Sequence, residues 1–406
     1  MAELDVDFVR AQFPAFSDPS LAGLANFENA GGSYVCTPVI DRLTRFYTSR
    51  KMQPYGAAAP TAAGGAEMDE AGARLAAMLN VGEDELSFGP STTQNTYVLA
   101  NAFRQMMQAG DAVIVTNQDH EANSGPWRRL ADEGFEVREW RMNAAGHLDI
   151  ADLQALLDDK VRLVCFPHCS NIVAEINDAQ AIVAAVHAAG AVACVDGVSY
   201  APHGLPDVGA LGADIYLFSA YKTYGPHQGI MCVKRELRDA LPNQGHWFNA
   251  DYPGKRLTPA GPDHAQIAAC AGVADYIDIL HGHHSNDDPG PVARAKRVHD
   301  LMRGREIALT APVLDCVAEL DVQLLGPSDA ASRAPTIALH HARAGADLAV
   351  ELAGQGIICG GGDFYAIRLL QGIGIDPAHG VLRVSFTHYT SEGEIADLCT
   401  ALRRVL

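Results

Sequence analysis

Lys222 lies between two apolar runs that predict buried strands. The first run, Ile215–Phe218, ends four residues before Lys222, and the second, Ile230–Val233, follows a sharp Gly225-Pro226 turn. Desolvation disfavours the charged form of a lysine, so a buried amine becomes neutral more readily than one in water. A neutral amine is a nucleophile that forms a Schiff base with an aldehyde. This position therefore predicts covalent chemistry at Lys222.

Polar side chains accompany three other predicted strands in the same part of the chain. They are His120 after the run at 111–117, Asn171 after the run at 161–167, and Asp196 within the run at 191–197. Ser219 lies in the run at 214–220, just before Lys222. The carboxyl ends of parallel strands meet at one edge of a sheet, where α/β proteins bind their ligands. The sequence therefore predicts an imidazole, an amide, a carboxylate and an amine around one site.

A predicted helix start upstream adds a second kind of binding group. Ser91, Thr92 and Thr93 open the stretch "STTQNTYVLANAF", and Ser91 and Gln94 have the spacing of a capping box. The free N–H groups at a helix N-terminus bind phosphate. Helix capping alone is the commoner use of such residues, but capping and phosphate binding use the same N–H groups and do not exclude each other.

These groups together fit one cofactor, pyridoxal 5′-phosphate. A lysine can form a Schiff base with its aldehyde, an aspartate can keep its pyridine nitrogen protonated, and a helix start can bind its phosphate. A lone lysine after a strand is usually a solvated loop residue. The combination of Lys222, Asp196, His120 and Asn171 at successive strand ends favours the cofactor over that interpretation.

The elements that must position these residues indicate an α/β fold. Continuous apolar strands alternate with helices between residues 80 and 235, which is typical of a mainly parallel sheet covered on both faces. After the Pro/Gly-rich stretch at 251–266 the pattern becomes helical and then mixed. We expect strands at Thr336–His340, Gly356–Ile358 and Val381–Phe386, and helices at 346–354 and 392–405. The sequence thus predicts an N-terminal arm at 1–25, a large domain at 26–265 and a smaller α+β domain at 266–406.

Charge and cysteine usage limit the partners and the compartment. Thirty basic and forty-nine acidic residues give a formal net charge of −19, spread along the chain, which argues against nucleic acid and anionic membrane as partners. The nine cysteines contain no C-x-x-C pair, which suits a reducing compartment. The N-terminal residues are acidic where a signal peptide is basic, and no apolar run approaches membrane-spanning length. We therefore expect a cytoplasmic protein.

With these motifs in place, the sequence resembles the class V aminotransferase family, which has fold type I of the pyridoxal-phosphate enzymes, and within it the cysteine-desulfurase-like branch. The resemblance covers nearly the whole chain, from "FENAGGSYVCTP" at 27–38 to "VLRVSFTHYTSEGEI" at 381–395. It implies a homodimer that acts on a small amino-acid substrate. The Pro/Gly-rich stretch at 251–266 is the segment that we expect to reach the partner's cofactor.

The resemblance also implies a role for each site residue. Lys222 would form the Schiff base with the cofactor, Asp196 would pair with the pyridine nitrogen, His120 would stack on the ring, and Asn171 would contact the ring's 3′-oxygen. The implied phosphate and ring contacts are completed by Ser91, Thr92, Thr93, Ser199, Ser219 and Tyr221. The implied substrate contacts are Asn29, Ala30, Gly31, Tyr365 and Arg383, the last of which would bind the substrate carboxylate. A surface ion pair is the alternative interpretation of Arg383.

The chain departs from the family pattern at several positions. Family desulfurases usually have histidine where this chain has Tyr221 and glutamine where it has Ser199. The threonine that contacts the partner subunit's phosphate falls at Gly261. Desulfurases also carry a nucleophilic cysteine before the final strands, and the alignment places Tyr365 there, with Cys359 six residues earlier.

The missing cysteine bears on the reaction, because a thiolate is the nucleophile that accepts sulfur and a phenol cannot replace it. We therefore expect a pyridoxal-phosphate enzyme, a desulfurase-like lyase or aminotransferase that lacks the usual persulfide cysteine. Two alternatives remain. One is a true cysteine desulfurase that uses Cys359, and the other is a non-catalytic binding or scaffold protein of the same fold.

Two further motifs predict no additional site. The stretch "HGHHSNDD" at 281–288 has no metal-ligand spacing, so we expect a solvated loop between helices and no metal. The glycine run at 360–362 lacks the Lys-Ser/Thr of a phosphate loop, and we expect a flexible or tightly turned active-site loop there.

Overall fold

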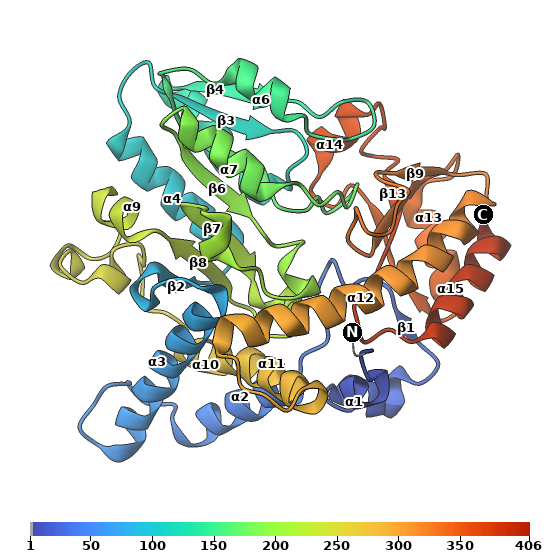
Figure 1. Ribbon diagram of the computed structural model, residues 1–406, viewed down its shortest axis with the longest axis horizontal. Coiled ribbons are helices and arrows are strands. Elements are labelled where there is room, and N and C mark those ends of the chain that lie inside the picture. Colours follow the sequence, from blue (N-terminus) through green and yellow to red (C-terminus); the bar gives the residue numbers. More distant parts are fainter. Residues whose placement is uncertain (1–2) are drawn as a thin grey trace.

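A seven-stranded sheet forms the centre of the larger of two lobes in the computed structural model, which describes residues 3–406 (Figure 1). The strand order is β2 (Leu86–Gly89), β8 (Gly229–Val233), β7 (Ile215–Ser219), β6 (Val192–Asp196), β5 (Val161–Pro167), β3 (Ala112–Thr116) and β4 (Glu136–Trp140). Strand β8 runs antiparallel to both of its neighbours, and the other pairs are parallel. The predicted mainly parallel sheet is therefore confirmed.

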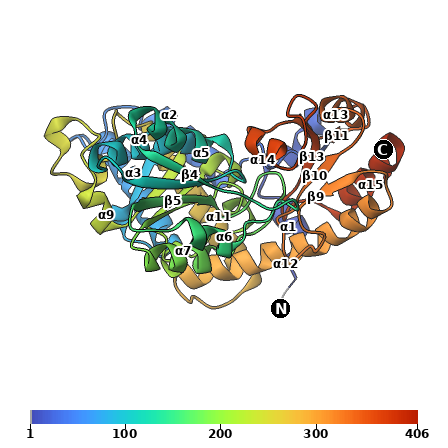
Figure 2. The same ribbon diagram turned by 90° about the horizontal axis from the view of Figure 1, so that it is seen from above.

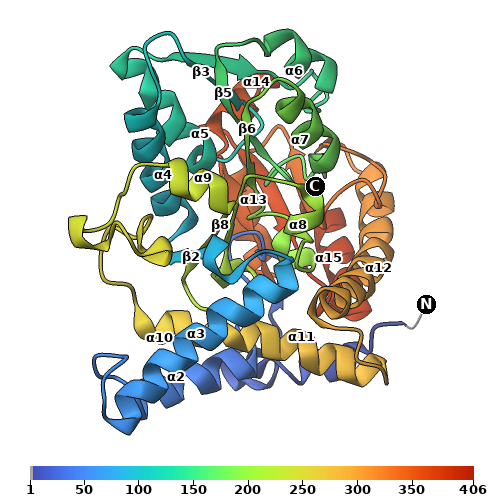
Figure 3. The same cartoon turned by 60° about the vertical axis from the view of Figure 1, so that its left-hand side comes forward.

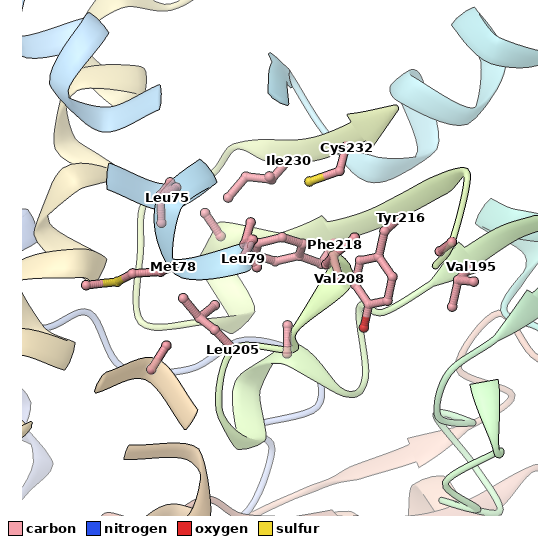
Figure 4. Packing of buried hydrophobic residues seen from close by; sticks show 14 of the residues in the cluster. Leu75, Met78, Leu79, Val195, Leu205, Val208, Tyr216, Phe218, Ile230 and Cys232 are labelled. Carbon is pink, nitrogen blue, oxygen red and sulfur yellow. The ribbon is translucent and has the colours of Figure 1, made fainter. Parts of the chain in front are cut away.

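Both faces of this sheet are apolar, because successive side chains of each strand point to opposite faces. In β7, Tyr216 and Phe218 join the core on one face, and Ile215 and Leu217 join the core on the other. Figure 4 shows the first of these cores, where Phe218 lies among side chains of β8 and of the helix that carries Leu75.

Helices cover the two faces as the alternating pattern predicts. The first face packs against α3 (Ala59–Leu79), α7 (Ala179–Ala188), α11 (Ala271–His284) and the N-terminal part of α12 (Pro291–Ala318). The second face packs against α4 (Thr92–Met106) and α5 (Glu121–Arg128). Shorter helices lie in the connections: α1 (Val6–Arg10), α6 (Ile150–Leu156), α8 (Val208–Leu211), α9 (Arg235–Ala240) and α14 (Ile367–Gly372).

Helices α10 (His264–Ala269) and α11 lie beside α2 (Thr37–Ser49) and α3 at one end of the larger lobe (Figure 3). The sequence-based expectation of a loop over 281–288 was wrong in its first half, because His281 to His284 form the last turn of α11. His281 is buried within this layer, and its packing extends the helix through the glycine at 282.

The smaller lobe contains a four-stranded antiparallel sheet of order β12 (Gly360–Gly362), β13 (Val381–Ser385), β10 (Thr336–His340) and β9 (Gln323–Leu325). Helices α13 (Gly345–Ala353) and α15 (Glu392–Val405) pack on its core. The short strands β1 (Ala25–Asn26) and β11 (Ile357–Ile358) pair in parallel beside it. The strands and helices predicted here lie within one or two residues of those observed.

The glycine run at 360–362 is a strand, not the predicted flexible loop. A Cβ atom at Gly361 would lie 2.1 Å from the backbone oxygen of Gly345, at the start of α13. Glycine is thus needed at 361 because β12 and α13 approach each other closely.

Helix α12 runs beneath both lobes and connects them (Figure 2). Its Ala295, Val298 and Met302 join the core of the larger lobe, whereas Leu309 and Val313 join the core of the smaller one. We therefore propose that the lobes divide within α12, and not at residue 265. No helix within residues 3–406 combines the length and apolarity needed to cross a membrane.

Candidate active site

Lys222 lies in the connection between β7 and β8. Because these strands are antiparallel, a short connection suffices, and no crossover helix is needed. Two backbone hydrogen bonds fix the turn: Ala220 N–H donates to Gln228 O over 2.8 Å, and Gly225 N–H donates to Ala220 O over 2.9 Å. The turn holds the lysine side chain at the sheet edge with 8% of its surface exposed.

The Lys222 amine has an altered acidity. Burial and the nearby Arg383 charge lower the pKa of Lys222 to about 8, while Asp196 and Glu28 act in the opposite direction. No hydrogen bond contributes to this shift. The neutral form, which attacks an aldehyde, is therefore far more abundant near neutral pH than for a lysine in water, although the charged form still predominates.

Asp196 ends β6 beside Lys222. Its Oδ1 accepts a hydrogen bond from Val198 N–H over 2.8 Å. Burial raises the pKa of Asp196 to about 6, although this hydrogen bond and the Lys222 charge lower it. The group remains mostly ionised at neutral pH, and its charge becomes more favourable when a cation is placed against it.

His120 forms the N-cap of α5, where its Nδ1 accepts a hydrogen bond from Ala122 N–H over 3.0 Å. Burial, together with the charges of Lys222 and Arg383, lowers the pKa of His120 to about 3. The imidazole is therefore neutral at physiological pH, and because Nδ1 accepts, Nε2 carries the proton. The residue presents a flat, uncharged ring with one free donor.

The other end of the site is built at the start of α4. Ser91 caps this helix, and its Oγ accepts a hydrogen bond from Gln94 N–H over 3.1 Å, which is one of the two bonds of the predicted capping box. The hydroxyls of Thr92 and Ser219 are 2.8 Å apart. At Gly229 of β8, a Cβ atom would lie 2.4 Å from Ser91 C, so the glycine permits β8 to approach the helix start. Hydroxyls and N–H groups thus converge where an anion can bind.

A cavity lies between these groups. All ten residues that the sequence analysis assigned to the cofactor line it: Ser91, Thr92, Thr93, His120, Asn171, Asp196, Ser199, Ser219, Tyr221 and Lys222. The remaining lining residues, which sequence reasoning missed, are Ala122, Pro167, Cys169 and Val198. These four are neighbours of predicted residues, and no signal in the sequence distinguishes them.

The five residues predicted to contact the substrate lie outside this lining. Asn29 is buried, its Oδ1 accepts from the Tyr389 hydroxyl, and its Nδ2 donates to Ser385 O over 3.2 Å. Ala30 N–H donates to Ser385 Oγ over 2.8 Å. The loop that contains Asn29, Ala30 and Gly31 is thereby tied to the end of β13.

Arg383 points from β13 toward the same loop and is 3% exposed. Its Nη2 lies 2.6 Å from Oε1 of Glu28, and its guanidinium lies 3.8 Å from the ring centroid of Phe364. Sequence reasoning missed both partners. The signal for Glu28 was its place in "FENAGG", an acidic residue directly before the predicted substrate loop.

Tyr365 and Cys359 lie in different surroundings. Tyr365 is 71% exposed, and its ring centroid is 5.4 Å from that of His120. Its carbonyl accepts from Glu121 N–H over 2.8 Å. Cys359 packs against the core of the smaller lobe, and burial, with the Glu28 charge, raises the pKa of its thiol to about 12.

The family model for aminotransferase class-V matches residues 25–248. The chain belongs to this family. It is similar to an aminotransferase-like protein of Gibberella zeae, FGM3, with 32% identity across 100% of this chain and 99% of that protein. A cysteine desulfurase of Pectobacterium atrosepticum is 29% identical, with 98% of each chain covered.

Solved structures of cysteine desulfurases have the same fold as this class-V chain. The desulfurase CsdA of Escherichia coli gives a TM-score of 0.84 at 23% identity, covering 100% of this chain and 99% of that one. The desulfurase of Thermococcus onnurineus NA1 gives 0.85 at 20% identity, covering 100% and 98%. The predicted fold type I is thus confirmed.

Class-V aminotransferases and cysteine desulfurases depend on pyridoxal phosphate, and the cavity fits this group. The Lys222 amine is buried, and no hydrogen bond contributes to its lowered pKa. Asn171 Oδ1 is buried and has no hydrogen-bond partner within residues 3–406. Both atoms belong to residues that line the cavity. The helix start at Thr92 and the carboxylate of Asp196 would be the partners of its phosphate and its pyridinium nitrogen.

Proposed function

We propose that this protein is a pyridoxal-phosphate enzyme that acts at the α-carbon of an amino acid, as a desulfurase-like lyase or aminotransferase without a persulfide cysteine. The observation that carries the proposal is the gathering of ten predicted residues, including Lys222, Asp196 and His120, around one cavity. Bound cofactor supplies an electron sink for carbanion chemistry at that carbon.

The side chains of this chain have separate tasks in the proposal. The Lys222 amine would hold the cofactor through its aldehyde carbon, and as an acid and base it would move the proton at the substrate's α-carbon. Asp196 holds a proton on the pyridine nitrogen, and its burial strengthens that pairing. His120 supports the ring face as a neutral imidazole, and the α4 start with Thr92 and Ser219 binds phosphate.

The second part of the proposal concerns the reaction type: the enzyme works without a persulfide-forming cysteine. Tyr365 is a phenol on an exposed turn and cannot carry sulfane sulfur. Cys359 is the alternative nucleophile, but its thiol packs against an apolar core and its pKa is about 12, which leaves almost no thiolate at neutral pH. Both observations support elimination or transamination over a true desulfurase.

The absorption spectrum of the purified protein with pyridoxal phosphate tests the proposal. We expect a band from lysine-bound cofactor that disappears in Lys222→Ala, and a spectral change when a substrate amino acid is added. Keto acid, ammonia or sulfide should then be released. A scaffold protein of the same fold would release none of these. If cysteine left a protein-bound persulfide that Cys359→Ala abolished, the protein would be a true desulfurase.

We also propose that the enzyme works as a homodimer. The segment after α9 carries three exposed aromatic side chains, Trp247, Phe248 and Tyr252, which we call the aromatic patch. Exposed aromatic clusters mark protein interfaces. The hollow next to this segment is lined by Leu257, Gly261 and Ser91, so a second copy seated on it would reach the phosphate end of the site.

The nine cysteines are all free, which supports a cytoplasmic location.

A further inference from the structure

Arg383 already binds a carboxylate of its own chain. Glu28 Oε1 accepts from Arg383 Nη2 over 2.6 Å, and Asn171 O accepts from Nη1 over 3.3 Å. Carboxylates bind a guanidinium in its plane, whereas aromatic rings stack on its face. The Phe364 ring therefore leaves the in-plane donors free, and Glu28 is the carboxylate bound to them, through Nη2; Nε has no hydrogen-bond partner within residues 3–406.

Glu28 fits a shaped space. A Cβ atom at Gly31 would lie 2.9 Å from Glu28 Oε1, and one at Gly360 would lie 2.6 Å from Oε2. A side chain at either position would therefore force the Glu28 carboxylate to move. Oε2 is buried and has no hydrogen-bond partner within residues 3–406, so Arg383 is the only side chain that stabilises this charge by direct contact.

The same pair withholds Arg383 from the cavity. The cavity lining includes Asn171 and Lys222 but not Arg383, which is 3% exposed. A ligand carboxylate can reach the guanidinium only by replacing Glu28 or by binding beside it. Both routes are unfavourable, because the first leaves the Glu28 charge without its partner and the second places two carboxylates at one cation.

We propose that Glu28 determines substrate specificity by competing with the substrate carboxylate for Arg383. The inference rests on the proposed function and adds a selection rule to it. An amino acid anchored by its carboxylate alone binds weakly, and a good substrate needs further contacts with the cavity to displace Glu28. Small amino acids with apolar side chains are therefore poor substrates of the wild-type enzyme.

Binding of propionate to the cofactor-loaded enzyme tests this directly, because propionate has a carboxylate but no amine and so does not react. We expect calorimetric titration to show propionate binding at least about tenfold tighter in Glu28→Gln than in wild type, since an unneutralised buried guanidinium attracts anions strongly. Neutral propionamide should bind both proteins equally. The matched control is Glu121→Gln, which also removes one negative charge. Glu121 follows His120 in the sequence, and its Oε2 lies 3.4 Å from Arg368 Nε rather than at Arg383. This variant should change propionate affinity by less than about twofold.

A second variant protects the test against misfolding. Glutamine has the size of glutamate and can still accept from Arg383, so Glu28→Gln should fold, although the uncompensated Arg383 charge should lower its unfolding temperature. Adding Arg383→Gln to Glu28→Gln should abolish the gain in affinity. Equal propionate affinity in wild type and Glu28→Gln, or a gain that survives Arg383→Gln, would overturn the inference. Neither result affects the proposed function, which depends on the Lys222 absorption band.

Discussion

At the scale of single residues, the buried amine of Lys222 destabilises the cofactor-free protein near neutral pH. The pKa of Lys222 is lowered from 10.5 to about 8, so the unfolded chain binds a proton more tightly than the folded one. Below pH 8 both forms are protonated and the folded form bears the full penalty. Between about 8 and 10.5 the folded form loses its proton first, so stability rises with pH.

This pH dependence of stability gives a prediction for Lys222→Met. The lowered pKa corresponds to roughly 3 kcal/mol, so the cofactor-free variant should be more stable than wild type by up to about that amount at neutral pH. The difference should shrink as the pH rises above 8. Denaturant unfolding at several pH values measures it. Lys296→Met, at an exposed position, should stay within about 0.5 kcal/mol of wild type throughout. A pH-independent difference for Lys222→Met would contradict the argument.

At the scale of elements, the close approach of β8 to the start of α4 shapes the proposed phosphate end of the site. A Cβ atom at position 229 would lie 2.4 Å from Ser91 C and 2.8 Å from Thr92 N, and both are backbone atoms that cannot turn aside. Any larger residue must therefore separate the strand from the helix start.

We predict that Gly229→Ala destabilises the protein by about 1–3 kcal/mol and weakens pyridoxal-phosphate binding, because overpacking displaces the helix N-terminus. Denaturant unfolding and a spectral titration with the cofactor measure the two effects. Gly72→Ala is the matched control. Nothing lies within 4 Å of a Cβ atom at this position inside α3, and alanine there should stabilise by about 0.5–1 kcal/mol. Unchanged cofactor affinity in Gly229→Ala would show that the contact does not shape the site.

The sequence predicted most of these elements because their signals are local. The buried strands are continuous apolar runs, and Lys222, Asp196 and His120 each lie at the end of one. Contacts between distant segments leave no such signal. Glu28 and Arg383 are 355 positions apart, so their pairing could not be read from either neighbourhood. For the same reason the glycines at 360–362 were interpreted as a loop, because the α13 backbone that requires Gly361 and the Glu28 side chain that lies against Gly360 are distant in the sequence.

At the scale of the whole molecule, the candidate site combines a cavity of the larger lobe with side chains of the smaller lobe. The cavity belongs to the larger lobe, while Arg383 and Tyr365 come from the smaller one, and α12 connects both (Figure 2). The aromatic patch lies on the opposite side of the larger lobe from α13, in the yellow segment that follows α9 in Figure 1. Its side chains therefore have no partner within the smaller lobe.

If the aromatic patch forms the dimer interface, a substitution in it should weaken dimerisation, and the fraction of dimer should fall on dilution. Trp247 is 86% exposed, and burying such a side chain at the centre of an interface commonly contributes 2 kcal/mol or more, so Trp247→Ser should raise the dimer dissociation constant at least about thirtyfold. Sedimentation or light scattering across a dilution series measures this. Val350→Ser, 73% exposed on α13, should leave the constant unchanged. Because Ser91 lines the hollow formed by residues 257–263 of the same segment, cofactor affinity should fall in Trp247→Ser as the protein is diluted. A wild-type protein that stays monomeric at micromolar concentration with cofactor bound would refute the dimer, and the patch would then need another partner.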